Sequence, residues 1–244
     1  MHRVERAIIM AAGSGKRMKP ITLMTPKPLI RVKGCRMIDT VIQGLQKNGI
    51  YEIYVVVGYL KEQFTRLEEE YSGVKLIENP YFESCNNISS LYVAREYIGN
   101  AIILDGDQII YKPEVLAPEF ELSGYNSIWT DEETDEWLQT VEGGIVTSCS
   151  RTGGKSGWRL YSISRWTKED GRKLKADLEL EFEVRKNCQI YWDDVVMFCH
   201  PEHYKLGIWP MQEGEIIEVD TLKELAELDE NYREYLNGGT KNEW

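Results

Sequence analysis

The stretch that decides the fold is RAIIMAAGSGKR, residues 6–17. Its first part, Ala7 to Met10, is a short apolar run of the kind found in buried β-strands. The run leads directly into a loop with glycines at positions 13 and 15. A buried strand followed by a glycine loop is typical of α/β proteins, so this stretch predicts an α/β fold that begins with a central strand.

Helices and strands are expected to alternate over the next hundred residues. Apolar side chains recur at helical spacing from Met37 to Leu45, and the β-branched content of residues 51–57 is typical of a strand. The expected helices are residues 37–48, 61–71 and 88–97, and the further strands are 74–77 and 101–104. Such alternation predicts a mostly parallel sheet with helices on both faces.

The alternation of expected helices and strands becomes less regular past residue 112. The expected strands are residues 127–129, 139–141, 144–146 and 160–163, and the expected helices are 176–182 and 222–236. No proline- or serine-rich linker divides the chain. We therefore interpret residues 1–244 as one domain with an embedded subregion in the second half and a frayed tail at 237–244.

Charge is distributed unevenly along the chain. The 244 residues include 40 acidic and 29 basic side chains, a formal net charge of −11. No acidic residue lies between Glu5 and Asp39, although eight basic residues do. Such a stretch would attract a polyanion such as a nucleoside triphosphate, whereas the acidic remainder disfavours nucleic acid as a partner.

Other sequence features limit the location and chemistry of the protein. The longest apolar runs are far shorter than the roughly 20 residues that span a bilayer, so no membrane insertion is expected. No signal-peptide cleavage site precedes the glycine loop, which favours a cytoplasmic location. The five cysteines show no paired spacing and are expected to be free thiols. The oligomeric state, a homodimer included, is left open.

The glycine loop has the features of a phosphate-binding site. Glycines allow backbone N–H groups to approach phosphate oxygens, and Lys16 and Arg17 add positive charge. A second cationic motif, TPKPL at residues 25–29, follows. The loop lacks the third glycine of a Rossmann fingerprint and the Lys-Ser/Thr pair of a Walker loop.

Two carboxylate motifs are candidates for a metal site. LDGD, residues 104–107, follows an expected buried strand, where ligand sites of α/β sheets form. IIEVDT, residues 216–221, places Asp220 at the end of another apolar run. Carboxylates suit Mg²⁺, but Asp220 or Thr221 could equally cap the helix expected at residue 222.

In combination, GxGxR and the later Thr-Pro-Lys-x-Leu resemble the signature of the nucleotidyltransferases that activate sugar phosphates and small alcohol phosphates. The resemblance implies a Rossmann-like nucleotidyltransferase fold with a small acceptor-side subregion. Residues 1–112 would then mainly bind the nucleotide and residues 113–236 mainly the acceptor.

The resemblance also implies roles for individual residues. Arg17 and Lys27 would be catalytic, because they would neutralise the phosphates during transfer. Asp107 and Asp220 would hold Mg²⁺, the expected cofactor. The implied nucleotide-binding residues are Ala11, Ala12, Gly13, Ser14, Gly15, Asn86, Asn87, Ser89 and Asp105.

Three blocks narrow the resemblance to the bacterial phosphocholine cytidylyltransferases. They are NPYF followed by NNISSL (residues 79–82 and 86–91), TDEW (134–137) and YWDD (191–194). This subfamily implies transfer of CMP from CTP to phosphocholine, giving CDP-choline and pyrophosphate. Because a trimethylammonium group donates no hydrogen bond, aromatic faces and carboxylates would hold it. The implied acceptor-binding residues are Glu136, Trp137, Lys155, Tyr191, Trp192 and Asp194, with Lys155 on the phosphate.

Other functions stay open at this point. The acidic residues near Glu136 would also suit the primary ammonium of 2-aminoethylphosphonate or phosphoethanolamine. A sugar-1-phosphate nucleotidyltransferase would lack the Asn86-Asn87 block. A retaining glycosyltransferase would share the Asp-Gly-Asp motif without needing the glycine loop, and a regulatory nucleotide sensor would have lost a metal carboxylate or Lys27.

Overall fold

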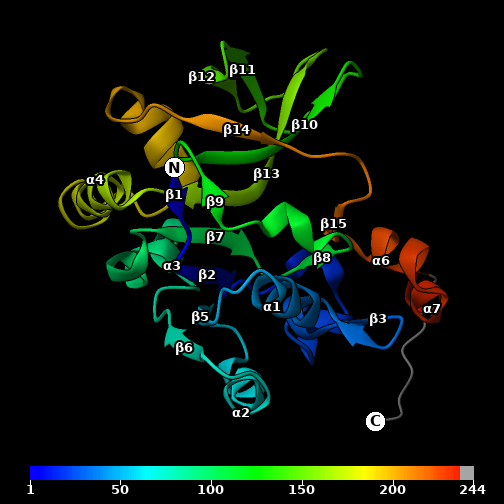
Figure 1. Cartoon of the computed structure of the whole chain (residues 1–244). Coiled ribbons are helices and arrows are strands. Elements are labelled where there is room, and N and C mark those ends of the chain that lie inside the picture. The colour runs from blue at the N-terminus through cyan, green and yellow to red at the C-terminus, as the bar shows by residue number, and fades with distance from the viewer. Residues whose placement is uncertain (237–244) are drawn as a thin grey trace.

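The computed structural model describes residues 1–236, so the tail expected at residues 237–244 lies outside the described part. Its centre is a nine-stranded mixed sheet in the order β10-β14-β12-β11-β13-β7-β2-β5-β6 (Figure 1). These strands are β2 (Arg6–Ala11), β5 (Glu52–Val57), β6 (Val74–Glu78), β7 (Ala101–Asp105), β10 (Gly124–Thr130), β11 (Leu138–Glu142), β12 (Ile145–Ser150), β13 (Gly157–Trp166) and β14 (Gly207–Pro210). The predicted α/β class and the strands predicted in the first half are confirmed.

The two halves of the sheet differ in strand direction. β7, β2, β5 and β6 pair in parallel, as predicted. β13 pairs antiparallel with β7, and β11 pairs antiparallel with β12 across a turn at Gly143 and Gly144. A turn that short can join only antiparallel strands. The sheet is therefore mixed, as the fold class implies: its first half is parallel, and its second half is mainly antiparallel, with β10 and β14 as a parallel pair.

The α-helices are α1 (Met37–Lys47), α2 (Arg66–Glu70), α3 (Ile88–Val93), α4 (Lys168–Glu179), α5 (Trp192–Asp194), α6 (Leu222–Leu228) and α7 (Arg233–Leu236). Because side chains of a strand alternate between its faces, β2 contributes to two separate cores. Ala7 and Ile9 pack with α1 on one face, whereas Ile8 and Met10 pack with α3 and α4 on the other (Figure 1). Helices thus cover both faces, as predicted.

Two helix predictions need correction. The helix expected at residues 176–182 begins at Lys168, because the Thr167 side chain accepts a hydrogen bond from the Asp170 backbone N–H and caps it. The helix expected at 222–236 is interrupted after Leu228, where Asp229 accepts a hydrogen bond from the Asn231 N–H instead.

A small two-stranded sheet joins distant parts of the chain. β8 (Gln108–Ile110) pairs antiparallel with β15 (Ile216–Glu218), and Gln108 lies opposite Glu218. This pairing brings the Asp105-Gly106-Asp107 turn beside the residues around Asp220. The remaining short pairs are β1 (His2–Arg3) with β9 (Glu119–Phe120) and β3 (Arg31–Val32) with β4 (Cys35–Arg36).

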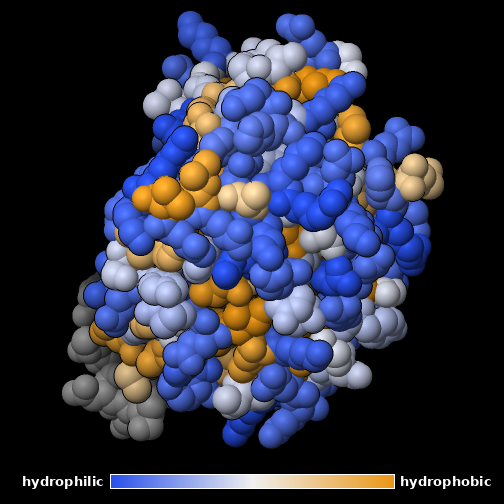
Figure 2. All heavy atoms as spheres, turned by 90° about the vertical axis from the view of Figure 1, so that its left-hand side faces the viewer, coloured by the Kyte–Doolittle hydropathy of each residue, from blue (hydrophilic) through white to orange (hydrophobic). Residues whose placement is uncertain are grey.

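The surface is mainly polar. On the face that Figure 2 shows, hydrophilic residues predominate and apolar residues gather in small separate groups. Within residues 1–236, no helix is both long enough and apolar enough to cross a bilayer.

Candidate active site

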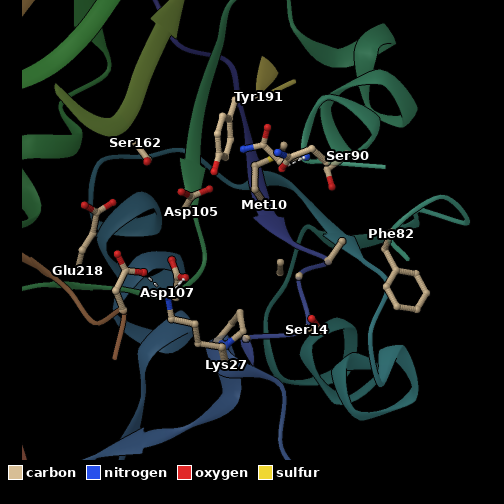
Figure 3. A pocket seen from close by; sticks show the side chains of 18 of the residues that line it. Met10, Ser14, Lys27, Phe82, Ser90, Asp105, Asp107, Ser162, Tyr191 and Glu218 are labelled. Carbon is tan, nitrogen blue, oxygen red and sulfur yellow. Dashed lines mark hydrogen bonds and ion pairs between the residues drawn. The ribbon is translucent and has the colours of Figure 1, made fainter. Parts of the chain in front are cut away.

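A cavity of about 800 Å³ lies at the carboxyl ends of β2 and β7. Ligand sites of α/β sheets form at this edge, because the loops that leave the strands diverge there. The glycine loop and the Asp105-Gly106-Asp107 turn both line the cavity. Figure 3 shows Asp105, Asp107 and Glu218 grouped on one side of it, with Phe82 and Ser90 on the opposite side.

The glycine loop has the backbone geometry that its sequence predicts. Gly15 has a φ of 59° and a ψ of 39°, in the left-handed region that favours glycine. A Cβ at this position would lie 2.8 Å from Thr22 Cγ2. The Thr22 hydroxyl donates a hydrogen bond to the Gly15 carbonyl over 2.9 Å and so holds the loop in place. All predicted loop residues, Ala11 to Gly15, line the cavity.

Lys27 lies between two carboxylates. Its side chain is only 9% exposed, and its Nζ lies 2.5 Å from Asp107 Oδ2 and 2.7 Å from Asp220 Oδ1. Burial alone would lower the pKa of Lys27, but the two carboxylates outweigh burial and hold its pKa above the usual value. Arg17 Nη2 lies 2.9 Å from Asp220 Oδ1. Burial would raise the Asp220 pKa, but the two cations hold it below its usual value. The predicted catalytic and metal residues thus form one cluster.

This cluster carries more carboxyl groups than cations. Asp105 and Glu218 also line the cavity. Burial, followed by the charge of Asp107, raises the pKa of Asp105 well above its usual value. Burial likewise raises the pKa of Glu218 to about 7, although Gln108 donates it a hydrogen bond of 2.9 Å. Such raised values show that further positive charge at this edge would be favourable.

The donor set at this edge fits Mg²⁺. Lys27 contacts Asp107 through Oδ2 and Asp220 through Oδ1, so each carboxylate keeps a second oxygen. One or two carboxylates, completed by phosphate oxygens and water, are the ligands that Mg²⁺ takes in nucleotide enzymes. Asp107 and Asp220 are the residues that could hold it. Asp220 does not itself cap α6, because Thr221 accepts the capping hydrogen bond from the Glu224 N–H.

The asparagine and serine block forms another wall. Asn86, Asn87 and Ser89 all line the cavity, as the sequence predicts. The Asn87 side-chain oxygen accepts a hydrogen bond of 2.9 Å from the Trp192 backbone N–H, so it also ties this wall to the second half of the chain. Asn79, the first residue of the NPYF block, donates hydrogen bonds of 3.0 Å to the hydroxyls of Ser89 and Ser90.

Only some of the residues predicted for the acceptor lie at the cavity. Glu136, Trp137 and Tyr191 line it, and the rings of Trp137 and Tyr191 meet at 88° with centroids 6.1 Å apart. They form a corner with two aromatic faces.

Trp192, Asp194 and Lys155 do not line the cavity, which corrects three predictions. Trp192 is 3% exposed and stacks on Tyr125 in the core. Asp194 accepts a hydrogen bond from the Tyr191 N–H and pairs with Arg151 at 2.6 Å. Lys155 is exposed in the turn between β12 and β13. In one helical turn, successive side chains point in different directions, so Trp192 to Asp194 could not all face the same ligand.

Asp193, the other carboxylate of the YWDD block, lines the cavity, whereas Asp194 does not. Its side chain is partly buried, and burial raises its pKa to about 7. Its Oδ1 atom is buried, and the nearby Tyr125 hydroxyl partly offsets the rise in this pKa. The Asp193 carboxylate lines the cavity and can accept a hydrogen bond from a ligand N–H.

Glu218 lines the cavity but was not among the predicted site residues, although the sequence contains a signal for it. It precedes Asp220 by two positions in an expected strand, and residues two apart share one face of a strand. Asp193 has the same signal as Asp194, its neighbour in the YWDD block, and which of the two faces the cavity depends on how the helix docks.

Comparisons with known proteins agree with this geometry. The sequence profile of the nucleotidyl transferase family matches residues 6–118. The chain is 38% identical to the 2-aminoethylphosphonate cytidylyltransferase of Lancefieldella rimae over 93% of this chain and 92% of that protein. It is 30% identical to the choline-phosphate cytidylyltransferase of Streptococcus pneumoniae over 92% and 97% of the two chains. The solved structure of a CTP:phosphocholine cytidylyltransferase from S. pneumoniae superposes with a TM-score of 0.87, at 30% identity, over 95% of this chain and 100% of that one.

Proposed function

The chain belongs to the nucleotidyl transferase family, among its bacterial cytidylyltransferases, and from this premise we propose that it transfers CMP from CTP to a small phosphate or phosphonate that carries an amine. Pyrophosphate would be the second product. The cavity at the carboxyl edge of the sheet supports this reaction, because it has a glycine loop and cations at one end and carboxylates with aromatic faces at the other.

The residues at the glycine loop can perform this transfer by positioning and charge. An oxygen of the acceptor phosphate or phosphonate attacks the α-phosphate of CTP, and this oxygen is already anionic at neutral pH, so no general base is required. Lys27 stays protonated between its carboxylates and, with Arg17, can neutralise charge that develops on the phosphates. Mg²⁺ held by Asp107 and Asp220 would supply further charge neutralisation and orient the triphosphate.

The acceptor that the geometry supports best carries a primary ammonium, as 2-aminoethylphosphonate does. The observation that carries this choice is the pair of carboxylates, Asp193 and Glu136, that line the same cavity as Trp137 and Tyr191. An ammonium N–H would form a charge-assisted hydrogen bond with either carboxylate. A trimethylammonium group has no N–H to donate. One relative described above acts on 2-aminoethylphosphonate.

Phosphocholine, the acceptor that the sequence favours, is the second candidate. The corner formed by Trp137 and Tyr191 supports it, because aromatic faces attract a methylated ammonium group. The corner offers two faces, since Trp192 is packed in the core.

The test is pyrophosphate release with CTP and Mg²⁺ against phosphocholine, phosphoethanolamine, 2-aminoethylphosphonate and glucose-1-phosphate. We expect kcat/KM to be highest for 2-aminoethylphosphonate and turnover to stop when a chelator removes Mg²⁺. Preference for phosphocholine would overturn the choice of acceptor and keep the reaction. Turnover of glucose-1-phosphate alone would overturn the amine class.

An Asp193→Asn variant separates the two candidates further. It keeps the size of the side chain but removes the charge, so we expect kcat/KM for the primary amine to fall by about 10- to 100-fold, as for loss of a charge-assisted hydrogen bond of roughly 1.5–3 kcal/mol. Asp135→Asn is the matched control, because Asp135 is exposed, directly precedes Glu136 in the chain and does not line the cavity. An equal loss in both variants would argue against contact between Asp193 and the amine.

A further inference from the structure

Two of the three histidines of the chain meet outside the cavity. His200 and His203 stack with ring centroids 5.1 Å apart, and Asp177 of α4 lies beside both. One ligand atom from each of the three residues lies within 4.8 Å of the others. None of the three lines the active-site cavity. The proposed cytidylyl transfer therefore leaves this cluster without a role.

The distances within the cluster suit a tetrahedral metal ion. His203 Nδ1 lies 2.9 Å from Asp177 Oδ2, and His200 Nδ1 lies 4.0 Å from Asp177 Oδ1. Metal–ligand distances of about 2.0–2.2 Å in a tetrahedral zinc site separate the ligand atoms by roughly 3.4 Å. Small side-chain rotations would therefore bring the three ligands to a common centre.

The neighbours of these residues are those that orient metal ligands. His200 Nε2 lies 2.8 Å from the carboxylate of Glu181, which directs Nδ1 of the same ring toward Asp177. The Tyr204 hydroxyl donates to Asp177 Oδ2 over 2.5 Å. Histidine ligands of zinc commonly bond a carboxylate through their other ring nitrogen, and carboxylate ligands accept a further hydrogen bond.

The charge of the cluster also favours a cation. The side chains of Asp177 and Glu181 are 8% and 1% exposed. Arg185 pairs with Glu181, but within residues 1–236 no lysine or arginine pairs with Asp177. A buried carboxylate without a full cationic partner is costly, and a divalent ion would compensate it. The His203 side chain is 43% exposed, so an ion can enter from solvent.

We propose that Asp177, His200 and His203 form a binding site for a divalent transition-metal ion, with Zn²⁺ as the ion that their donor set fits best. Two imidazoles and a carboxylate leave a fourth tetrahedral position for water at the exposed edge. The ion would tie α4 to the segment that follows α5, the helix that carries Asp193. The site would then stabilise the acceptor side of the molecule without taking part in catalysis.

The test uses the full-length chain without an affinity tag, freed of metal by a chelator and kept in excess Mg²⁺ so that the active-site carboxylates are occupied. Calorimetric titration with Zn²⁺ should give one site per chain. A Co²⁺ titration should give the visible absorption of a tetrahedral site without thiolate charge-transfer bands. The melting temperature should rise with Zn²⁺, because an ion that binds only the folded chain stabilises it.

Three variants identify the ligands. His203→Ala should weaken Zn²⁺ binding by at least about 100-fold, and Tyr204→Phe, which removes only the hydroxyl on Asp177, by about 10-fold. His2→Ala is the matched control, because His2 is exposed near the N-terminus and packs against Phe120 instead. Turnover of CTP by His203→Ala near the wild-type rate shows that this variant folds.

Each contrary result overturns the proposal. Wild-type affinity in His203→Ala would place the ion elsewhere, and thiolate bands with Co²⁺ would assign it to cysteines. The absence of stoichiometric binding to the wild-type chain would leave the cluster as a hydrogen-bonded contact between α4 and the segment after α5.

Discussion

The two ends of the active-site cavity are built in different ways. The loop end, residues 11–17 with Lys27, comes mostly from one continuous stretch that leaves β2. The aromatic end, Glu136, Trp137, Tyr191 and Asp193, comes from two segments more than fifty residues apart. Backbone geometry and charge determine what the loop end can bind, whereas the directions of single side chains determine what the aromatic end can bind. The comparison teaches that a general phosphate site can be encoded locally, while acceptor selectivity depends on how distant segments dock.

The largest effect is expected at the loop end, from Lys27→Ala. This change removes the cation between Asp107 and Asp220, so we expect kcat to fall by about 100- to 1000-fold for every acceptor, the loss typical of one electrostatic contact to a transition state. Steady-state pyrophosphate release measures it. Lys19→Ala is the control, because Lys19 is exposed in the same basic stretch and does not line the cavity. Near-normal turnover in Lys27→Ala would contradict the conclusion that charge at the loop end supports catalysis.

A smaller, acceptor-dependent effect is expected at the aromatic end when the pH changes. Burial raises the pKa of Asp193 to about 7, so this carboxyl gains its charge between pH 6 and pH 8. Because only the ionised form attracts an ammonium group, KM for a primary amine acceptor should fall by up to about 10-fold over this range. KM for CTP should change much less.

The Asp193→Asn variant provides the reference for this pH profile. Glu218, whose pKa is also about 7, and the acceptor itself can titrate in the same range. The ratio of wild-type to variant KM isolates Asp193, and a ratio that is constant from pH 6 to pH 8 would contradict its role.

The smallest expected effect is on stability, at Gly15 of the glycine loop. Gly15→Ala places a Cβ in the left-handed region and 2.8 Å from Thr22 Cγ2, so the free energy of unfolding should fall by about 1–2 kcal/mol. Gly13→Ala is the control, because a Cβ there meets nothing within 4 Å. Urea denaturation without ligand measures both. Equal stability of the two variants would show that the loop does not depend on the conformation of Gly15.

The predicted residues that line the loop end of the cavity share a physical property. Ala11 to Gly15 lie at the end of β2 or directly after it, Asp107 lies two residues after β7, and Asp220 lies two residues after β15. Where a strand ends, the direction of the chain follows from local pattern alone. The proximity of Asp107 to Asp220 follows from the pairing of β8 with β15, which the apolar runs alone did not predict.

The residues of α5 have the opposite property, because the sequence alone does not decide which of them faces the cavity. Trp192, Asp193 and Asp194 are consecutive, and their composition suited an acceptor pocket equally well. Trp192 packs against Tyr125 in the core, and Asp194 forms an ion pair with Arg151 instead of lining the cavity. Asp193 is then the side chain that reaches the cavity.

The sequence by itself thus determined the α/β class, the parallel first half of the sheet, the glycine loop and the family signature. These depend on short-range periodicity and on residues adjacent in the chain. Only the tertiary structure decided which acidic and aromatic side chains face the acceptor, and that Asp177, His200 and His203 meet. Such contacts join segments that are distant in sequence, or depend on the rotation of one helical turn, and both are determined by how the core packs.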